Sequence, residues 1–372
     1  MLLKNLISNL KPEVAAIKIK NISFDSRNVK KGDLFISIKG DKYDGHDYID
    51  KAILKGAKVV IHSSKIKKNN KIKFLKLKDT KAILARLSTN YYKNKPKNII
   101  AVTGTNGKTS VSDFFYQIFS LQNIKSGFIG TLGFRKDNSL KKRNLTTLDS
   151  LTLNKDLNDM KKSGIDNVII EASSHGLKQK RLNFLKIKAG IFTNLSHDHL
   201  DYHRNMKNYL NSKLLLFKHI LQKKSTVITD TDIQQYKKIK KIQKKRKLKI
   251  LTIGLKSNKF RILHHEIYKN FQCLEIKYNN KIYSLKVNLF GSIQIKNLLM
   301  AILAANVCGL KIKSIFNNIH KIRSVDGRLQ LIRTLTNKSK IFVDYAHTPD
   351  ALENAILSLR EHFKKKITVI FG

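Results

Sequence analysis

Apolar and polar positions alternate along the chain in short runs that predict strands and helices in turn. The apolar run Ile99–Val102 predicts a strand, and the apolar positions within 111–119 lie three and four residues apart, as on one face of a helix. The same alternation continues through residues 125–171 and 189–217. We therefore expect an α/β fold with a doubly wound, mostly parallel sheet in this part of the chain.

The N-terminal part has a shorter pattern of the same kind. Strands at 34–40 and 58–62 with a helix at 48–54 indicate a small α/β domain. Ser26 and Arg27 precede a turn here. They could bind an anionic ligand, or they could be a turn cap and a surface charge.

The polar stretch 93–98 predicts a linker between this domain and the rest. Toward the other end, the pattern predicts a helix at 294–308 and strands at 340–343 and 367–371. A length of 372 residues fits two or three domains.

A glycine-rich segment, TGTNGKTS, joins the strand at 99–102 to the helix that follows it. Backbone N–H groups of such a loop surround a phosphate, Lys108 would reach the terminal phosphates, and the Thr109 hydroxyl would bind Mg²⁺. The full Walker pattern needs a glycine where Val102 stands, so the loop indicates a nucleoside triphosphate without indicating the reaction. The alternative to a phosphate-binding loop is a turn of Gly, Thr and Asn without a ligand. The sequence GKT so soon after an apolar strand disfavours this alternative.

Titratable side chains follow the predicted strands at the sheet edge where ligands bind. Glu171 ends one strand and is a candidate Mg²⁺ ligand. Asp198 or His199 could hold a metal ion or orient a phosphate, or Ser196 or Asp198 could instead cap a helix. Lys213 lies in an otherwise apolar or neutral helix, where it could simply be exposed.

The charge is strongly basic, with 74 Lys and Arg against 26 Asp and Glu and a net charge of +48. Such a balance suggests nucleic-acid binding. The basic residues are spread along the whole chain, however, and the densest run, 237–249, keeps apolar residues at helical spacing. A proteome rich in lysine explains this better, so we expect no specific nucleic-acid partner.

The cysteines and apolar runs bear on the compartment. Cys273 and Cys308 form no CxxC motif, which fits a reducing cytoplasm and excludes a metal site made of cysteines. No apolar run approaches the ~18 residues of a membrane span, and the first residues do not read as a signal peptide. We expect a cytoplasmic protein with no membrane partner.

Several segments together resemble the Mur ligases, over essentially the whole chain: FDSR, GDLFISIKG, DGHDYI, VTGTNGKTS, LTTLDSLTL, EASSHGLKQKRL, FTNLSHDHLDYH, YLNSK, GRLQ and DYAHTPDAL. The most specific of these are EASSHGL, DHLDYH and DYAHTPDAL. They point to the branch of the family that adds the third residue of the peptide.

The resemblance implies an α/β fold of three domains. These are a small N-terminal UDP-substrate-binding domain at 1–94, a central P-loop-type ATPase domain with a mostly parallel sheet at 95–331, and an incomplete Rossmann-like amino-acid-binding domain at 332–372. It also implies a monomeric, cytoplasmic, ADP-forming ligase of peptidoglycan synthesis that uses ATP and Mg²⁺. ATP would phosphorylate a carboxylate of UDP-N-acetylmuramoyl-L-alanyl-D-glutamate, and a diamino acid would attack the acyl phosphate. The diamino acid expected is meso-diaminopimelate, with lysine as the alternative.

The resemblance also implies residue roles. ATP would be held by Gly104, Thr105, Asn106, Gly107, Lys108, Thr109, Ser110, Arg328, Asp344 and His347. The UDP-peptide substrate would be held by Phe24, Ser26, Asp41, Lys42, Tyr43, Thr146, Thr147, Ser173, Gln179 and Arg181. The metal ligands would be Thr109, Glu171, His199 and Lys213 as a carbamate. The catalytic residues would be Lys108, His199 and Lys213.

Some positions depart from the family pattern. Leu145, Thr229 and the pair Ile293-Gln294 stand where the family usually has Asn, Asn and Phe-Asn. The family also continues beyond Gly372 with the segment that selects the amino acid. The chain as given is therefore expected to be truncated and unable to ligate by itself. The alternative reading is a remnant that binds ATP and UDP-substrate without ligating.

Overall fold

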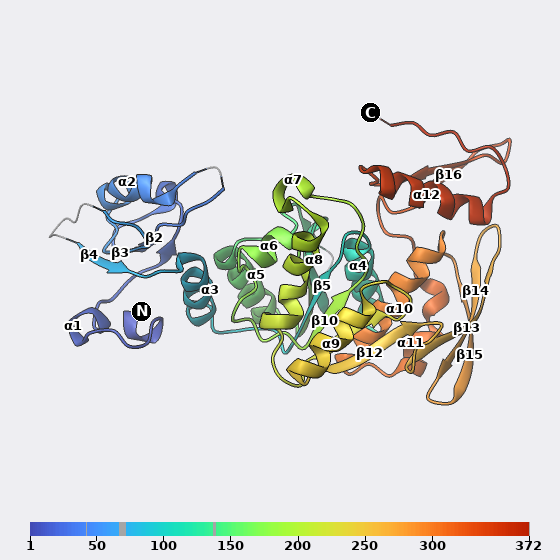
Figure 1. Cartoon of the computed structure of the whole chain (residues 1–372), viewed down its shortest axis with the longest axis horizontal. Helices are drawn as coiled ribbons and strands as arrows, with labels where there is room; N and C mark the ends of the chain where they lie inside the picture. Colours follow the sequence, from blue (N-terminus) through green and yellow to red (C-terminus); the bar gives the residue numbers. More distant parts are fainter. Residues whose placement is uncertain (42, 67–71, 137–138, 372) are drawn as a thin grey trace. The chain divides into compact units, whose positions relative to one another are not determined.

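The computed structural model describes residues 1–41, 43–66, 72–136 and 139–371, and the chain forms two compact units (Figure 1). The first unit contains Met1–Lys95, Leu148–Lys162 and Lys178–Leu185, and the second contains Pro96–Thr147, Ser163–Leu177 and Lys186–Gly372. The domain boundaries near 94 and 331 stay predictions. No helix of the described residues is long and apolar enough to cross a bilayer.

The first unit is built on a four-stranded parallel sheet in the order β1-β2-β3-β4. Successive residues of its strands alternate between two apolar clusters: Leu34 and Ile36 face one, and Phe35 faces the other. Both faces of the sheet are therefore buried, as in α/β domains. Its elements are η1 (Leu3–Asn5), α1 (Pro12–Ala15), β1 (Ile22–Ser23), η2 (Ser26–Asn28), β2 (Leu34–Ile36), η3 (Gly45–Tyr48), α2 (Ile49–Leu54), β3 (Val59–His62), β4 (Lys73–Lys76), α3 (Thr80–Tyr91) and α5 (Ser150–Lys162).

The second unit is built on a sheet of eleven strands in the order β15-β14-β13-β12-β11-β10-β5-β9-β6-β7-β8. Its central part is parallel, which confirms the expected doubly wound α/β sheet. The parallel strands are β5 (Asn98–Thr103), β6 (Ser126–Gly130), β9 (Asn167–Glu171), β10 (Ala189–Phe192), β11 (Thr226–Asp230) and β12 (Lys249–Gly254). The edges are β7 (Gly133–Lys136) and β8 (Ser139–Lys141) on one side, and β13 (Phe260–Ile267), β14 (Gln272–Tyr278) and β15 (Lys281–Val287) on the other.

Helices cover this sheet and bury their apolar faces on it (Figure 1). The apolar positions predicted for the first of them, α4, are all buried: Val111, Phe114, Phe115, Ile118 and Phe119. The helices are α4 (Lys108–Ser120), α6 (Ser174–Lys178), α7 (Leu200–His203), α8 (Met206–Leu215), the π-helical η4 (Leu216–Ile220), α9 (Tyr236–Arg246), α10 (Ser292–Val307), α11 (Ile312–Asn317) and η5 (Ile319–Lys321).

The last part of the chain forms β16 (Gln330–Thr334), β17 (Lys340–Val343) and α12 (Pro349–His362). The two strands pair antiparallel with each other. The predicted strand at 367–371 was wrong, because the described part of the chain holds no strand paired with it. An extended segment without a partner gains no ladder hydrogen bonds, and Ile370 is 95% exposed.

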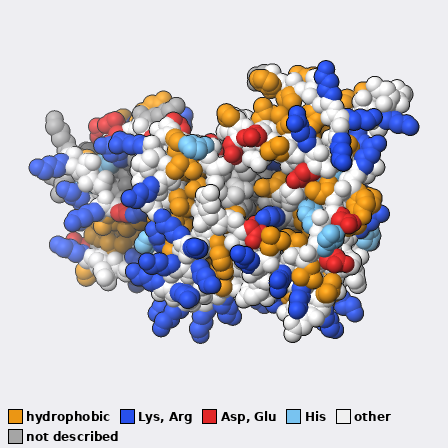
Figure 2. Space-filling model, turned by 45° about the vertical axis from the view of Figure 1, so that its right-hand side comes forward, with side chains coloured by type: hydrophobic (Ala, Val, Ile, Leu, Met, Phe, Trp, Pro, Cys, Tyr) orange, Lys and Arg blue, Asp and Glu red, His pale blue; other side chains and the backbone are white. Residues whose placement is uncertain are grey.

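Lysine and arginine side chains occupy several separate parts of the face in Figure 2, with few acidic side chains between them. This distribution follows the sequence, in which the basic residues are spread along the whole chain. It fits solvated surface positions better than one nucleic-acid-binding stripe.

Candidate functional site

The loop between β5 and α4 is fixed by the residues that follow the neighbouring strand β10. The carbonyl oxygen of Asn194 accepts from the Thr105 N–H at 3.0 Å, and its side-chain oxygen accepts from the Asn106 N–H at 2.9 Å. The Thr193 hydroxyl donates to the Asn106 carbonyl at 2.6 Å. These bonds hold the loop in shape at the carboxyl edge of the sheet, where doubly wound folds bind ligands.

Gly107 closes this loop and precedes the first residue of α4. Its φ of 86° lies in the left-handed region that favours glycine. A Cβ atom at this position would also overlap the side-chain oxygen of Asn297 on α10. Any other residue here would strain the backbone and force the Asn297 side chain to move.

Two lysines converge on the loop. Lys108 Nζ donates to the carbonyl oxygens of Gly104 and Thr105 at 3.0 and 2.7 Å. Lys213 Nζ, from α8, donates to the Gly104 carbonyl at 2.6 Å and lies 4.2 Å from the centre of the Tyr209 ring. Lys213 is only 1% exposed, so the exposed position considered from the sequence is wrong.

Burial shifts the protonation of both lysines. It holds the pKa of Lys213 well below its ordinary value, and the charge of Lys108 acts in the same direction. Burial also lowers the pKa of Lys108, although the Glu171 carboxylate opposes that shift. Lys213 is therefore the lysine of this site that is most easily neutral.

Glu171 ends β9 and is fully buried. Its carboxylate accepts from the Thr131 N–H at 3.1 Å, from the Thr131 hydroxyl at 2.9 Å and from the Thr109 hydroxyl at 3.3 Å. Burial raises the pKa of this carboxyl, while Lys108 opposes the shift. A buried carboxylate beside the hydroxyl at the start of α4 supplies the hard oxygen ligands that Mg²⁺ prefers.

The donor set fits Mg²⁺ held together with phosphate oxygens. Among the residues that the structure describes, no group of three or more His, Cys, Asp or Glu could hold a metal ion. Mg²⁺ at phosphate sites is usually bound by only one or two carboxylates, with substrate phosphates and water as the other ligands. Glu171 and Thr109 are sufficient for a site of that kind.

His199 and Asp198 lie at the same edge and line the same pocket. His199, with a φ of 51°, is the N-terminal cap residue of α7, so neither Ser196 nor Asp198, the capping residues considered as the alternative, caps this helix. Asp198 instead accepts from the His199 N–H at 2.8 Å. Burial lowers the pKa of His199, so a neutral imidazole with a ring nitrogen able to bind a metal is favoured.

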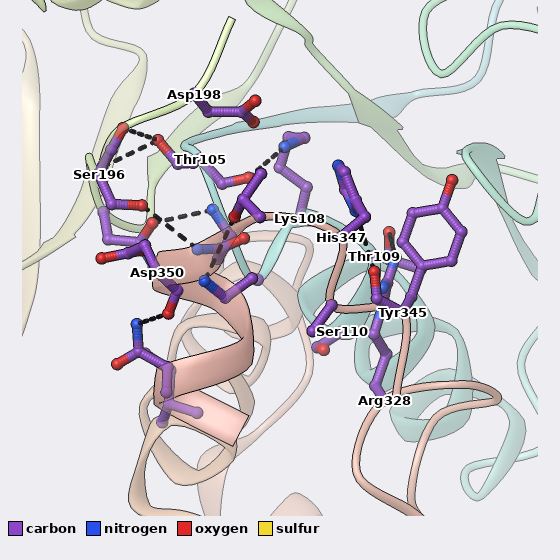
Figure 3. A pocket seen from close by; sticks show the side chains of 18 of the residues that line it. Thr105, Lys108, Thr109, Ser110, Ser196, Asp198, Arg328, Tyr345, His347 and Asp350 are labelled. Carbon is purple, nitrogen blue, oxygen red and sulfur yellow. Dashed lines mark hydrogen bonds between the residues drawn. The ribbon is translucent and has the colours of Figure 1, made fainter. Parts of the chain in front are cut away.

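The expected far-side residues also reach this pocket, whose volume is about 420 Å³. Arg328 donates to the Thr109 hydroxyl at 3.3 Å, and its guanidinium lies 4.6 Å from the centre of the Tyr345 ring. Asp344 accepts from the N–H groups of Leu329 and Ala346, both at 2.8 Å, which fixes the turn that presents His347. Figure 3 shows Arg328 and Tyr345 across the pocket from Ser196.

The expected substrate residues divide between the two units. Thr146 and Ser173 line the phosphate pocket. Thr147 is buried and accepts from the Ser173 N–H at 2.8 Å, so it positions Ser173. Phe24, Ser26, Tyr43, Gln179 and Arg181 instead line a cavity of about 590 Å³ in the first unit.

Asp41, another expected substrate residue, is linked to the lining of that cavity through Gln179. Asp41 accepts from the Gln179 side chain at 3.0 Å, and Gln179 in turn accepts from Arg181 at 2.6 Å. Arg27 pairs with Asp25 at 2.8 Å and is largely exposed, while Ser26 is buried. Lys42 lies outside the described residues.

Sequence reasoning missed several residues of the phosphate pocket: Thr131, Asn194, Asn297 and Asp350 line it as well. Only Asn194 and Thr131 carried a usable signal, since each follows the end of a strand in the parallel part of the sheet. Asn297 and Asp350 lie on helices, and their approach depends on how those helices pack.

Family models match most of the chain. The Mur ligase middle domain matches residues 102–305, the Mur ligase family catalytic domain matches 18–92, and the Mur ligase glutamate ligase domain matches 327–372. A UDP-N-acetylmuramoyl-L-alanyl-D-glutamate--2,6-diaminopimelate ligase of Rickettsia montanensis is 38% identical over 371 residues, which are 98% of this chain and 76% of that protein.

Solved structures of Mur ligases are also similar to this chain. A structure of UDP-N-acetylmuramoyl-L-alanyl-D-glutamate--2,6-diaminopimelate ligase has a TM-score of 0.83 and 28% identity, covering 97% of this chain and 74% of that one. The MurF ligase of Thermotoga maritima in complex with ADP shares the fold, with a TM-score of 0.62 and 18% identity over 92% of this chain and 75% of that one.

Proposed function

Because the chain belongs to the Mur ligase family, we propose that it joins 2,6-diaminopimelate to UDP-N-acetylmuramoyl-L-alanyl-D-glutamate with ATP, as the names of its relatives state for them. The reaction belongs to peptidoglycan synthesis. The observation that supports this most is the meeting of Lys108, Glu171 and Lys213 around one phosphate-binding loop. We place the protein in the cytoplasm as a monomer.

In the first chemical step, a carboxylate oxygen of the UDP-substrate attacks the γ-phosphorus of ATP. The bond from that phosphorus to the bridging oxygen breaks, so ADP leaves and an acyl phosphate forms. Both reactants are anions, and their repulsion is the main barrier to be offset. Lys108, Arg328 and the N-terminus of α4 supply positive charge at the loop, and Thr146 and Ser173 hold the incoming peptide.

In the second step, the amine of the amino acid attacks the acyl carbon. The carbon–oxygen bond to phosphate breaks, phosphate leaves, and the new amide nitrogen loses a proton. The acyl phosphate would also react with water, so the pocket must exclude it until the amine arrives.

Mg²⁺ is proposed to bind at Glu171, Thr109 and His199, where it would neutralise phosphate charge. The structure supports this by the donor chemistry already described, a buried carboxylate beside a hydroxyl.

Lys213 is proposed to carry a carbamate in the active protein. Only a neutral amine adds to CO₂, and the depressed pKa of Lys213 keeps the amine neutral at a lower pH than usual. The N–C bond forms as one C=O π bond of CO₂ opens, one proton leaves the nitrogen, and the neutral amine becomes a carbamate whose anionic oxygens would bind Mg²⁺.

The cavity of the first unit is proposed to hold the uridine part of the substrate. Phe24, Tyr43 and Tyr48 offer aromatic surface, and Arg181 offers a guanidinium for a phosphate or carboxylate. Asp41 and Lys42 are proposed to contact the same substrate.

The proposal is tested on the purified chain by measuring each pocket separately. Calorimetry should show binding of Mg·ATP and of UDP-N-acetylmuramoyl-L-alanyl-D-glutamate, and Lys108→Ala should abolish only the first. Mass spectrometry should then be used to look for the tripeptide product with 2,6-diaminopimelate and, separately, with lysine. A chain that binds neither Mg·ATP nor the UDP-substrate would refute the proposal.

A further inference from the structure

We propose that Asp350 selects the nucleoside part of ATP by accepting a hydrogen bond from it. Asp350 lies in the first turn of α12 and lines the phosphate pocket. Its Oδ2 atom is buried, and no hydrogen-bond partner for it lies among the residues that the structure describes. The inference rests on the proposed function and adds to it a residue that determines the specificity for the nucleotide.

The buried oxygen of Asp350 requires a donor. Of the described residues that line this pocket, Asp350 is the one with a buried side-chain oxygen left without a partner. Leaving such an atom unsatisfied is costly, and native structures rarely do so without a ligand or water at the site. An ionised carboxylate can only accept, so a ligand that satisfies this atom presents an N–H or an O–H to it.

The position of Asp350 separates it from the metal end of the pocket. In Figure 3 Asp350 lies on the opposite side of the pocket from Thr109, Arg328 and Tyr345. Thr109 contacts both Glu171 and Arg328, so the charge that attracts Mg²⁺ and the terminal phosphate gathers at that end. The other end, with Asp350, is left for the nucleoside.

The neighbours of Asp350 suit an uncharged ligand group. On α12 the pocket is lined by Ala351, Asn354 and Ala355, and on α10 by Gln294 and Asn297. These side chains are small or are neutral amides. They leave room for a flat base and its sugar, and they offer no cation for a phosphate.

The chemistry of ATP then limits the donor. Its phosphates carry only acceptor oxygens at neutral pH, and they would be repelled by a carboxylate. The donors of the nucleoside are the 6-amino group of adenine and the 2′ and 3′ hydroxyls of the ribose. One of these three groups faces Asp350.

The structural role of Asp350 is limited to the helix start and would act on all nucleotides alike. Thr348 already caps α12 by accepting from the Ala351 N–H at 3.2 Å. A carboxylate in the first turn also favours the helix through its dipole. Neither effect discriminates between ATP and an analogue that lacks one donor.

The test compares Mg·ATP with three analogues, each lacking one donor: purine riboside triphosphate, 2′-deoxyATP and 3′-deoxyATP. Binding is measured by calorimetry on the full chain, on Asp350→Ala and on Glu353→Gln, an exposed control on the same helix outside the pocket. The parent should bind one analogue about tenfold more weakly than ATP, equivalent to about 1.4 kcal/mol. Asp350→Ala should bind ATP about tenfold more weakly and no longer distinguish that analogue, while Glu353→Gln should behave as the parent.

Asp350→Asn keeps the side-chain shape without the charge and serves if the alanine variant does not fold. This variant should bind ATP more weakly than the parent does, and the difference in affinity between ATP and the same analogue should become smaller. Equal binding of ATP and all three analogues by the parent would overturn the inference, as would unchanged ATP binding by both Asp350 variants. If the inference about Asp350 fails but the parent binds ATP and Lys108→Ala does not, the proposed function still stands. A parent that binds no Mg·ATP would overturn both the inference and the proposed function.

Discussion

Lys108 and Lys213 donate hydrogen bonds to the same oxygen atom, the backbone carbonyl of Gly104, at 3.0 and 2.6 Å. Burial penalises the charged form of each ammonium group, so the pKa of each lysine is lowered. Glu171 offsets this for Lys108, whereas the charge of Lys108 adds to it for Lys213. The site therefore favours one charged lysine for phosphate and one neutral amine.

Replacing Lys108 by alanine should remove Mg·ATP binding. Lys108 is the flexible cation at the start of α4, and its present partners are loop carbonyls that a phosphate would replace. We expect the affinity for Mg·ATP to fall at least about 100-fold by calorimetry, as for loss of a charged contact in a dry site. Lys125→Ala, an exposed lysine before β6, is the control and should bind as the parent does. Unchanged affinity in a folded Lys108→Ala chain would exclude the loop from nucleotide binding.

The pKa of Lys213 predicts how stability changes with pH. In the unfolded chain the amine titrates near the ordinary value of 10.5, whereas burial holds the folded pKa well below it. Between these two values the unfolded state binds more protons, so the free energy of unfolding should rise with pH. Thermal melts of the parent and of Lys213→Met over that range should show a steeper rise for the parent. Lys207→Met, exposed on the same helix, should keep the parent slope.

The carbamate on Lys213 can be observed directly. With ¹³C-labelled bicarbonate, the parent should give a carbamate carbon signal by NMR that is absent in Lys213→Ala. Short carboxylates added to Lys213→Ala should restore part of any Mg·ATP-dependent turnover, because they supply the missing oxygen ligand. A folded parent that shows no carbamate signal under bicarbonate saturation would contradict the assignment.

The loop and Glu171 could be predicted from the sequence because each is encoded locally, whereas the role of Lys213 came only from the resemblance to the family. A strand followed by GKT fixes the loop, and a carboxylate after a buried strand must lie at the ligand edge. The contact of Asn297 with Gly107 joins α10 to a loop far away in the chain, and no local pattern encodes it. The predicted strand at 367–371 failed for a related reason: apolar alternation reports the tendency to be extended, and it does not report whether a partner strand is available.

Replacing Glu171 by glutamine should lower Mg·ATP-dependent turnover and should remove one contribution to the pH dependence of stability. Glutamine can still accept from the Thr131 N–H and can donate its amide N–H groups to the Thr109 and Thr131 hydroxyls, but it binds Mg²⁺ poorly. We therefore expect Mg·ATP-dependent turnover to fall about 100-fold or more. Because burial raises the folded pKa of Glu171 above its ordinary 4.5, the folded state holds the proton more tightly. The parent should therefore lose stability as the pH rises from about 4.5 through the folded pKa, and Glu171→Gln should not.

The control for Glu171 is Glu353→Gln, an exposed carboxylate on α12. It should change neither the turnover nor the pH dependence of the melting temperature. If Glu171→Gln were destabilised at neutral pH while it kept full Mg²⁺ dependence, Glu171 would be a structural acceptor and no metal ligand.

Replacing Gly107 by alanine should disrupt the loop through two effects that a matched glycine separates. Gly107 has a φ of 86°, and an added Cβ would overlap the Asn297 side chain. Gly164 has a similar φ of 79°, yet a Cβ there would meet nothing within 4 Å. Gly164→Ala should therefore show only the backbone strain, about 1 kcal/mol of the free energy of unfolding, with Mg·ATP binding unchanged. Gly107→Ala should cost about 1–3 kcal/mol more, since Asn297 must move, and should abolish detectable Mg·ATP binding. Chemical denaturation and calorimetry on both variants give the comparison, and equal losses in the two would mean that the contact with α10 does not shape the loop.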